Sequence, residues 1–385
     1  MRIGLVVPHI FMHRDILPHV IFSPGMLALD LAKGLRKQGI EVILYTPGPV
    51  DTAVTNVTAD LSYFKQELAG RGDSYLDLLK KHPFTFITLA RQVQSELVAK
   101  AYQDANDDLL DVVHIYTNEE DIALPFAALC KKPVAFTHHD PFNFLVKYKN
   151  VFPKYKRLNW LSISDAQRRS MPADTNWLDT IYHGADGQSL YPETRTRRGY
   201  IACIGRIIES KGTHLAIAAV QRYNSQNQDR PLQLRLAGKH YAGKKDSYWL
   251  DRIKPEIDNQ TIFYDKFISD DESKRQFLAN ADAIIVPSTF DEPFGMVMIE
   301  ALACGTPVIG LDSGAIPEVV IDHQTGFVVP KSDNEDATIG SLAQAIENIG
   351  TIDRTNCRND FEARFTTETM CRNHIDAYQK LLQNN

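Results

Sequence analysis

The stretch STFDEPFGMVMIEALACGTPVIGLDSGAIPEVV, residues Ser288–Val320, places a glutamate and a proline at the start of a predicted helix. Glu292 precedes Pro293, which fits the first helical position because its missing N–H would have no partner there. The helix would present the free backbone N–H groups of Phe294, Gly295 and Met296. These groups and the positive end of the helix dipole favour binding of a phosphate or an electron-rich hydroxyl.

Glu292 and Glu300 suit a ligand that carries many hydroxyl groups. Ionised carboxylates only accept hydrogen bonds, and a sugar offers many hydroxyl donors. On a continuous helix the two carboxylates would lie about 12 Å apart along the axis, so they would reach different parts of a long ligand. The spacing suggests a sugar, a diphosphate and a ribose laid across one helix end. Taken alone, such a pair is more often a solvated helix face.

The surroundings of this helix favour the binding site over the solvated face. Ala281–Pro287 has the pattern of a buried parallel strand, and Gly305–Gly310 begins another. Gly295 and Gly305 mark positions where the backbone approaches another group closely. A strand, a short loop and a helix N-terminus form the place where open α/β sheets bind ligands.

The composition indicates a two-domain protein without a nucleic-acid partner. The chain has 385 residues, of which 44% are hydrophobic. It is too long for a single hydrophobic core of ordinary size and suits two domains. Its formal net charge of −6 argues against binding to a phosphate backbone, which needs a concentrated positive field. The first strand starts at Arg2 without a signal-peptide pattern, and apolar runs such as Ala123–Cys130 are too short to cross a bilayer. We therefore expect a cytoplasmic protein.

The cysteines and histidines do not predict a metal site. The five cysteines are scattered and lack a CxxC or Cys/His ligand spacing, so they indicate reduced packing residues. His114 stands in a predicted strand, Asp111–Tyr116, and fits a core histidine better than a metal ligand. We expect no metal.

Two successive series of alternating strands and helices predict two doubly wound α/β domains. The first series has strands at Ile3–Pro8, Ile40–Tyr45, Val112–Tyr116, Pro133–Thr137, Leu161–Ser164 and Trp177–Tyr182. The second has strands at Tyr200–Gly205, Leu232–Ala237, Ile262–Tyr264, Ala283–Pro287, Val308–Leu311 and Gly326–Val329. Helices are predicted at Gly25–Lys37, within Thr85–Asp104, and at Thr213–Tyr223, Asp271–Ala279 and Pro293–Ala303. Thr46–Asp73 has weak periodicity, which would suit a long surface excursion.

A polar stretch, Glu193–Arg198, is the predicted linker between the domains. It divides the chain into an N-terminal domain of residues 1–191 and a C-terminal domain of residues 192–366. Residues 367–385 read as a C-terminal helix that could pack on either domain, including back on the N-terminal one.

The stretch from Glu292 through Gly295 to Glu300, followed by Ala301–Ile309, resembles the signature of family 4 of the retaining glycosyltransferases. Further segments stand in the family's order: Thr137–Asp140, Ser164–Gln167, His183–Asp186, Gly205-Arg206 and Lys211-Gly212. The resemblance covers most of the chain and implies the GT-B architecture, two facing Rossmann-like domains. In that architecture the C-terminal domain mainly holds the nucleotide-sugar, and the N-terminal domain mainly holds the acceptor.

The resemblance also implies roles for individual residues of the C-terminal domain. Arg206 and Lys211 would neutralise the leaving diphosphate, which lowers the barrier without a divalent metal. A lone pair of cations is usually solvated, but Arg206 follows a strand and Lys211 stands at a helix entrance. Glu292 would lie beside the transferred sugar and Glu300 beside the ribose. Backbone groups would bind sugar hydroxyls or phosphate, namely those of Phe294, Gly295 and Met296.

In the N-terminal domain, His139 resembles the histidine of the family's T-x-H pattern, which points at the transferred sugar. The doublet with His138 leaves the choice of histidine open, and Asp140 is a further candidate. Family members usually carry a glycine pair after the first strand, but this chain offers only Gly25, which could contact the diphosphate or simply begin the helix. The long loop His9–Ser23 could carry specificity or be plain surface.

Two further segments bear on the ligands. The sequences of Leu236–Lys239 and of the segment around Glu292 resemble most those of a subgroup that uses UDP-glucose. Lys239 would either reach the donor phosphates or simply be exposed to solvent. Phe144–Trp160 mixes basic and aromatic residues, which would suit peripheral contact with anionic lipid headgroups. An ordinary solvated surface is the favoured interpretation of that segment.

We therefore expect a retaining glycosyltransferase that moves a hexose, with glucose first, from a UDP-sugar to an acceptor hydroxyl, without a further cofactor. No second carboxylate is evidently placed as a covalent nucleophile, so the expected route is same-face attack with the diphosphate taking the acceptor's proton. The alternatives are a nucleotide-sugar epimerase, a sugar phosphorylase on the same fold, or a non-catalytic nucleotide-sugar-binding protein. The acceptor, a small molecule, saccharide or lipid, does not follow from the residues, nor do the linkage and oligomeric state.

Overall fold

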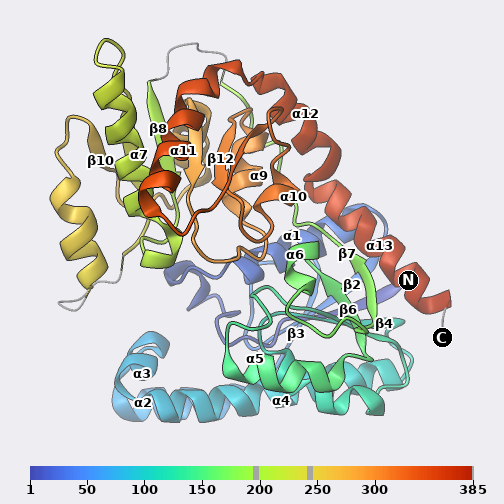
Figure 1. Ribbon diagram of the computed structural model, residues 1–385. Helices are drawn as coiled ribbons and strands as arrows, with labels where there is room; N and C mark the ends of the chain where they lie inside the picture. The colour runs from blue at the N-terminus through green and yellow to red at the C-terminus, as the bar shows by residue number, and fades with distance from the viewer. Residues whose placement is uncertain (194–198, 241–245, 384–385) are drawn as a thin grey trace. The chain divides into compact units, whose positions relative to one another are not determined.

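The structure is a computed structural model that describes residues 1–193, 199–240 and 246–383 (Figure 1). It contains two compact units. The first unit is Met1–Tyr182 together with the segment that begins at Thr367, and the second unit is His183–Thr366. The unit boundary thus precedes the predicted linker, of which residues 194–198 lie outside the described residues.

The first unit is built on a seven-stranded parallel sheet in the order β3-β2-β1-β4-β5-β6-β7. Its strands are β1 Arg2–Val6, β2 Glu41–Thr46, β3 Thr55–Thr58, β4 Val112–Tyr116, β5 Val134–Thr137, β6 Asn159–Ser162 and β7 Trp177–Thr180. Its α-helices are α1 Ser23–Lys37, α2 Ser62–Arg71, α3 Tyr75–Lys81, α4 Pro83–Asn106, α5 Val146–Val151, α6 Asp165–Arg168 and α13 Thr367–Gln383. The strand order reverses between β1 and β4, a switch point at which open sheets bind ligands.

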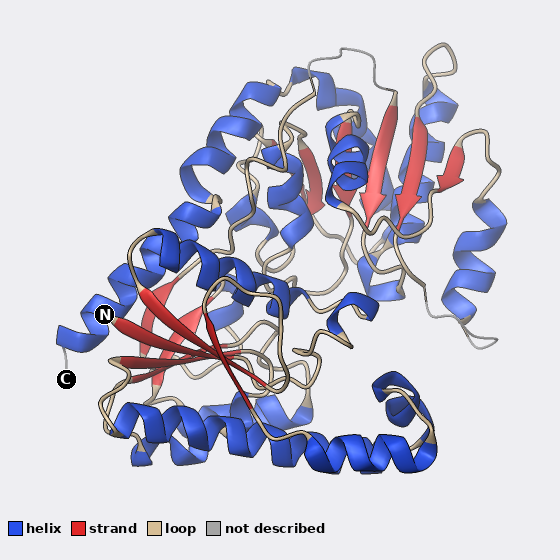
Figure 2. Ribbon diagram, turned by 180° about the vertical axis from the view of Figure 1, so that it is seen from behind, coloured by secondary structure: helices blue, strands red, loops and turns tan. Residues whose placement is uncertain are grey.

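The second unit repeats this plan with six parallel strands in the order β10-β9-β8-β11-β12-β13. The strands are β8 Tyr200–Ile204, β9 Gln233–Ala237, β10 Ile262–Tyr264, β11 Ala283–Val286, β12 Val308–Leu311 and β13 Gly326–Val329. The α-helices are α7 Thr213–Gln226, α8 Asp271–Ala279, α9 Met296–Ala303, α10 Ile316–Val319, α11 Glu335–Asn348 and α12 Arg354–Arg364. Figure 2 shows the strands of each sheet among helices, so the predicted doubly wound α/β fold is confirmed.

The C-terminal helix α13 belongs to the first unit, where it packs against α1 and β7. A Cβ on Gly34 of α1 would lie 2.4 Å from the sulfur of Cys371, so only glycine permits this approach. His114 Nδ1 lies 2.7 Å from the Tyr378 hydroxyl on α13, and its Nε2 lies 2.8 Å from Thr137 Oγ1. His114 is fully buried, which confirms the prediction of a core histidine.

The unassigned stretch Thr46–Asp73 contains the edge strand β3 and the helix α2. Its periodicity is weak because no residue of β3 is fully buried, and Phe64 is the one residue of α2 that is. In the described part of the chain, no helix is both long and apolar enough to cross a membrane. Within the same part, no three or more His, Cys, Asp or Glu side chains gather as metal ligands would.

Candidate active site

The loops that follow β8 and β11 meet at the switch point of the second sheet. The backbone N–H of Thr289 donates to the carbonyl oxygen of Ser210 at 2.9 Å, which joins the two loops. Gly212 has a φ of 69°, and a Cβ there would lie 2.0 Å from the carbonyl oxygen of Pro287. A glycine is therefore required before α7, and it brings the side chain of Lys211 to the β11 loop.

Lys211 and Glu292 form an ion pair at this junction. The Nζ of Lys211 lies 2.5 Å from Glu292 Oε1, and the hydroxyl of Ser288 donates to the same oxygen at 2.5 Å. The Glu292 side chain is 5% exposed, whereas that of Lys211 is 25% exposed. Lys211 also lies 4.8 Å from the centre of the Phe290 ring. The carboxylate is thus held in place from one side while its cation remains open to solvent.

The helix that carries Glu300 begins later than the sequence predicts. α9 starts at Met296, and Gly295 caps it with a left-handed φ of 95°. Pro293 and Phe294 lie in the preceding loop, so the prediction that Pro293 is the first helical residue is wrong. Because Gly295 breaks the helical path, the distance of about 12 Å along a continuous helix does not apply either.

Met296 is therefore the one residue of the predicted backbone trio that belongs to the first helical turn. Gly295 contributes its N–H from the cap position, and Phe294 from the loop. The Phe294 side chain is 1% exposed, with its ring centre 5.0 Å from that of His183. The Phe294 side chain is part of the packing, so only the backbone of this residue could contact a ligand.

Glu300 is also paired, with a lysine that is not among the predicted site residues. Lys274 on α8 places its Nζ 2.9 Å from Glu300 Oε1, and both side chains are partly exposed. Burial disfavours the charged amine, but the neighbouring Glu300 outweighs it, and the pKa of Lys274 lies above its usual value. The pattern DESKR of α8 looks like any solvated helix face, so it contains no signal for this contact.

A third loop, after β12, supports the backbone of Glu292. The N–H of Ala315 donates to the Glu292 carbonyl oxygen at 2.8 Å. Gly314 has a φ of 57°, and a Cβ there would lie 2.3 Å from both the backbone nitrogen and the oxygen of Glu292. The hydroxyl of Ser313 donates to the Phe290 carbonyl oxygen at 2.8 Å. No sequence pattern predicts this support, because it depends on close approach of the backbone.

Arg206 and Lys239 are exposed cations on two adjacent loops of the same sheet edge. The Ile207 N–H donates to the Lys239 carbonyl oxygen at 2.9 Å, which ties the loop after β8 to the loop after β9. The Lys239 ammonium lies 4.1 Å from the centre of the Phe267 ring. Among the described residues, the Arg206 guanidinium has no ion-pair partner. The edge therefore offers three cations, of which Lys211 already has a carboxylate partner.

In the first unit, the histidine doublet after β5 divides into two different environments. His138 is fully buried, with its Nδ1 3.1 Å from Glu120 Oε2. Its ring is enclosed by the aromatic rings of Phe142, Tyr148 and Phe152. Burial lowers the pKa of His138 to about 4 and raises the pKa of Glu120. His138 is therefore a core residue, which favours His139 of the two.

His139 and Asp140 lie in the loop that leaves β5. His139 is 7% exposed, and its ring centre lies 4.5 Å from that of Tyr116 in an edge-on contact. The Asp140 carboxylate accepts a hydrogen bond from Asn118 Nδ2 at 2.8 Å. The role of His139 at the sugar stays a prediction.

Gly25 has a packing reason to be glycine. It lies in the first turn of α1, and a Cβ there would lie 2.6 Å from the Met12 sulfur and 2.6 Å from the Phe22 ring. The loop before it is ordered by aromatic contacts, since the His9 ring stacks on Phe22 at 4.3 Å. Burial and the nearby Lys147 lower the pKa of His9 to about 4. Contact between Gly25 and a diphosphate stays a prediction.

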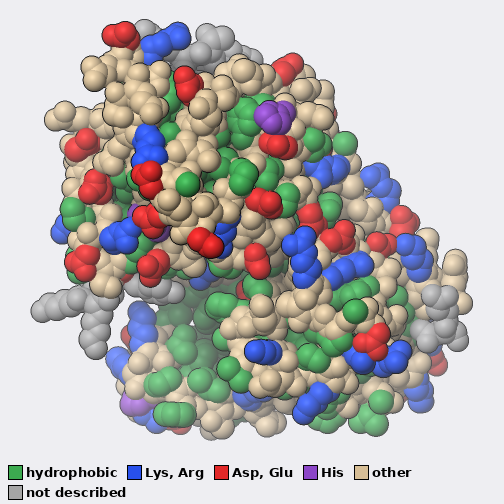
Figure 3. All heavy atoms as spheres, viewed as in Figure 1, with side chains coloured by type: hydrophobic (Ala, Val, Ile, Leu, Met, Phe, Trp, Pro, Cys, Tyr) green, Lys and Arg blue, Asp and Glu red, His purple; other side chains and the backbone are tan. Residues whose placement is uncertain are grey.

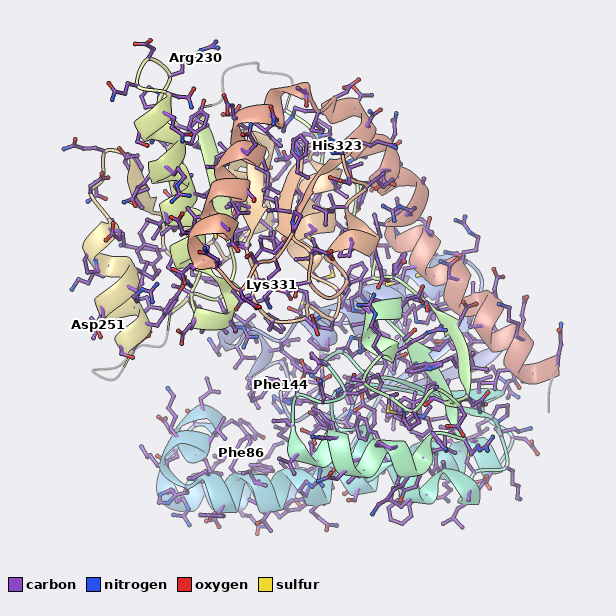
Figure 4. All side chains as sticks on the ribbon, viewed as in Figure 1. Phe86, Phe144, Arg230, Asp251, His323 and Lys331 are labelled. Atoms are coloured by element: carbon purple, nitrogen blue, oxygen red, sulfur yellow. The ribbon has the colours of Figure 1, made fainter. Side chains whose placement is uncertain are left out.

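The basic aromatic segment that begins at Phe144 does not form a uniformly basic surface. Lys147 pairs with Asp121 at 3.0 Å, and Lys156 pairs with Asp174 at 2.7 Å. Phe144 itself is 63% exposed and projects from the loop before α5 (Figure 4). Figure 3 shows acidic and basic side chains interspersed over the visible face of the molecule. These pairings favour an ordinary solvated surface.

The second unit matches a known protein family. Residues 192–362 match the family model described as glycosyl transferases group 1. The matched range contains Arg206, Lys211, Glu292 and Glu300. The match supports glycosyltransferase activity of this group.

Curated relatives match larger parts of the chain at low identity. The chain is 24% identical over 327 residues to the putative glycosyltransferase YtcC of Bacillus subtilis (strain 168), covering 77% of this chain and 78% of that protein. It is 28% identical over 257 residues to alpha-maltose-1-phosphate synthase of Mycobacterium tuberculosis, covering 57% of this chain and 62% of that protein. The matched segment therefore spans less than two thirds of the synthase.

Solved structures share the fold along the whole chain. Sucrose-phosphate synthase from Thermosynechococcus elongatus superposes with a TM-score of 0.72 at 18% identity, covering 100% of both chains. HepE from Anabaena, solved in complex with UDP-glucose, superposes with a TM-score of 0.66 at 18% identity, covering 99% of this chain and 100% of that one. At this identity the likeness shows the fold, which is the GT-B fold of glycosyltransferases.

Proposed function

We propose that this protein is a retaining glycosyltransferase that transfers a hexose from a UDP-sugar to an acceptor hydroxyl. The observation that carries the proposal is the Lys211–Glu292 ion pair beside the exposed Arg206, at the switch point of the unit that matches glycosyl transferases group 1. UDP-glucose is the first nucleotide-sugar to test, because the chain shares its fold with HepE, which was solved with that ligand. The proposal includes a cytoplasmic location and no metal or further cofactor.

The ion pair suggests how binding could prepare the site. A diphosphate placed among Arg206, Lys211 and Lys239 would compete with Glu292 for the Lys211 ammonium. Glu292, still held by Ser288, would then be able to accept a hydrogen bond from a hydroxyl of the transferred sugar. Binding would thus convert an internal ion pair into two contacts with the ligand, one for each partner.

The same groups would act on the reaction itself. As the bond between sugar and diphosphate breaks, charge grows on the diphosphate, and Arg206 and Lys211 would stabilise it. In same-face attack, the departing diphosphate takes the proton of the acceptor hydroxyl while the new glycosidic bond forms. Glu300 would hold the ribose, the N–H of Met296 would face a phosphate or hydroxyl, and His139 is proposed to contact the transferred sugar.

UDP release from a panel of UDP-sugars with pooled acceptors tests this function. Arg206→Ala is expected to lower transfer about 100-fold, because it removes a cation from the leaving group. Arg230→Ala is the matched control, since this exposed arginine lies in the α7–β9 loop, away from the switch point (Figure 4). Equal activity of the two variants would contradict the assignment of Arg206.

The other enzyme classes give different results in the same experiments. An epimerase would convert the sugar without releasing UDP, and a pyridoxal-dependent phosphorylase would show the absorption spectrum of its cofactor. A non-catalytic binding protein would bind UDP and release none from any UDP-sugar. Two features of this site, the exposed cation Arg206 and the buried carboxylate of Glu292, favour the transferase.

A further inference from the structure

Gln167, a buried residue of α6, ties down the loop that carries His139. It is 3% exposed, and its Nε2 donates to the carbonyl oxygens of His138 at 2.8 Å and Asp140 at 2.9 Å. Its Oε1 accepts a hydrogen bond from the Ile163 N–H at 3.1 Å. Both amide hydrogens and the amide oxygen are therefore used, and the two carbonyls that they hold stand on either side of His139.

Asn118, which follows β4, holds the same loop from a second direction. Its Oδ1 accepts a hydrogen bond from the His139 N–H at 3.1 Å, and its Nδ2 donates to Asp140 Oδ2 at 2.8 Å. The carbonyl oxygen of Asn118 accepts in turn from the Tyr148 hydroxyl at 3.1 Å. Asn118 is thus fixed at its backbone while its side chain bonds to both His139 and Asp140.

Only a side chain that donates and accepts at once can make these contacts. A carboxylate at position 167 would face two carbonyl oxygens, and a carboxylate at position 118 would face the carboxylate of Asp140. Packing alone would not require two amides to converge on the three residues His138, His139 and Asp140. We infer that Asn118 and Gln167 are positioning residues that set the location of the His139 ring and the Asp140 carboxylate for transfer.

This inference rests on the proposed function, in which His139 contacts the transferred sugar. A displacement of about 1 Å can cost about 100-fold in rate, so the loss of either amide should affect turnover more than substrate binding. The nucleotide part of the ligand is assigned to the second unit, whereas the two amides bond to residues of the first unit. The affinity for UDP should therefore be unchanged.

Gln167→Glu is the principal test, because it keeps the size and the oxygen that accepts from Ile163 but removes both donors. We expect kcat to fall about 100-fold, with KM for UDP-glucose and Kd for UDP within twofold of the wild-type values. Gln94→Glu is the matched control, since Gln94 on α4 is also 3% exposed but lies outside this loop. It should lower the melting temperature and leave kcat of the folded protein unchanged.

A double-mutant cycle separates positioning from a general loss of structure. If Gln167 acts through His139, Gln167→Glu should cost little further activity in the His139→Ala background. A full additional 100-fold loss in that background, or wild-type kcat in Gln167→Glu alone, would overturn the inference. Should Gln167→Glu fail to fold, Asn118→Asp supplies the second test with the same expected outcomes.

An NMR measurement tests the positioning without relying on turnover. The ring signals of His139, assigned by their loss in His139→Ala, should shift in Gln167→Glu and stay in place in Gln94→Glu. Unshifted His139 signals in Gln167→Glu would refute the positioning role of Gln167. A wild-type protein that releases no UDP from any UDP-sugar would instead refute the proposed function, so the two failures are distinguishable.

Discussion

The Lys211–Glu292 pair of the second unit and the His138–Glu120 pair of the first unit differ in their exposure to solvent. Each joins a nitrogen group to a carboxylate at the carboxyl edge of a parallel sheet. The Lys211 side chain is 25% exposed, whereas both side chains of the other pair are completely buried. An external ligand can therefore compete for Lys211, and none can reach His138.

Burial also changes the charge state of the inner pair. Burial raises the pKa of Glu120 and lowers that of His138 to about 4, so it disfavours the charged form of both groups. Glu120 Oε1 and His138 Nε2 have no hydrogen-bond partner among the described residues. The same residue chemistry is thus open to a ligand at one sheet edge and enclosed in packing at the other, and access to solvent makes the difference.

The largest expected effect breaks the exposed pair. Glu292→Gln keeps the shape but removes the charge that pairs with Lys211 and would accept from the sugar, so transfer should fall about 1000-fold. The measurement is UDP release at saturating UDP-glucose, with the melting temperature as a check on folding. Glu347→Gln, at an exposed position of α11, is the control. Transfer within tenfold of wild type would refute the role of Glu292.

The next effect breaks the buried pair and should appear in stability instead of catalysis. His138→Ala removes a ring packed among three aromatic residues and leaves Glu120 without its partner, so the free energy of unfolding should fall by about 3 kcal/mol. Denaturant unfolding measures it, and UDP affinity should be unchanged. An unfolding free energy equal to that of the wild type would mean that the pair contributes nothing to the core.

Much of this comparison could be predicted from the sequence, because it depends on local patterns. Buried parallel strands read as continuous apolar runs, and the order Arg206, Lys211, Glu292 placed three charges after strands whose carboxyl ends meet. The predicted start of α9 at Pro293 was wrong because Gly295 has a left-handed conformation that ends the helical path. No local sequence pattern distinguishes this glycine from a helical one.

Contacts between distant segments explain most of what the sequence could not reveal. Lys274 reaches Glu300 from another helix, and the need for Gly314 arises from the backbone of Glu292, more than twenty residues earlier. The doublet His138–His139 could not be resolved either, because burial by Phe142, Tyr148 and Phe152 is a property of the folded loop. Access to solvent, the property that separates the two pairs, is set by tertiary packing.

A smaller effect tests whether the second carboxylate of the switch point also depends on a lysine. Lys274→Met keeps the aliphatic stem but removes the charge that holds Glu300, so KM for UDP-glucose should rise about tenfold, which is about 1.4 kcal/mol. The kcat should stay within twofold, since Glu300 is assigned to the ribose. Lys254→Met, an exposed lysine of the same unit, is the control. A change in kcat without a change in KM would contradict that assignment.

The smallest effect is the pH dependence of the buried pair. The folded pKa of His138, about 4, lies below the usual value of 6.5, so between these values the unfolded chain binds a proton that the folded protein does not. Stability supplied by the neutral histidine is therefore present above pH 6.5 and is lost as the pH falls towards 4. At pH 5.5 this should amount to about 1 kcal/mol relative to pH 8.

Other buried histidines titrate as well, so the quantity to measure is the difference between the wild type and His138→Ala in denaturant unfolding at both pH values. Parallel pH profiles would mean that His138 is protonated in the folded core, and the contrast with the exposed Lys211–Glu292 pair would then rest on access to solvent alone.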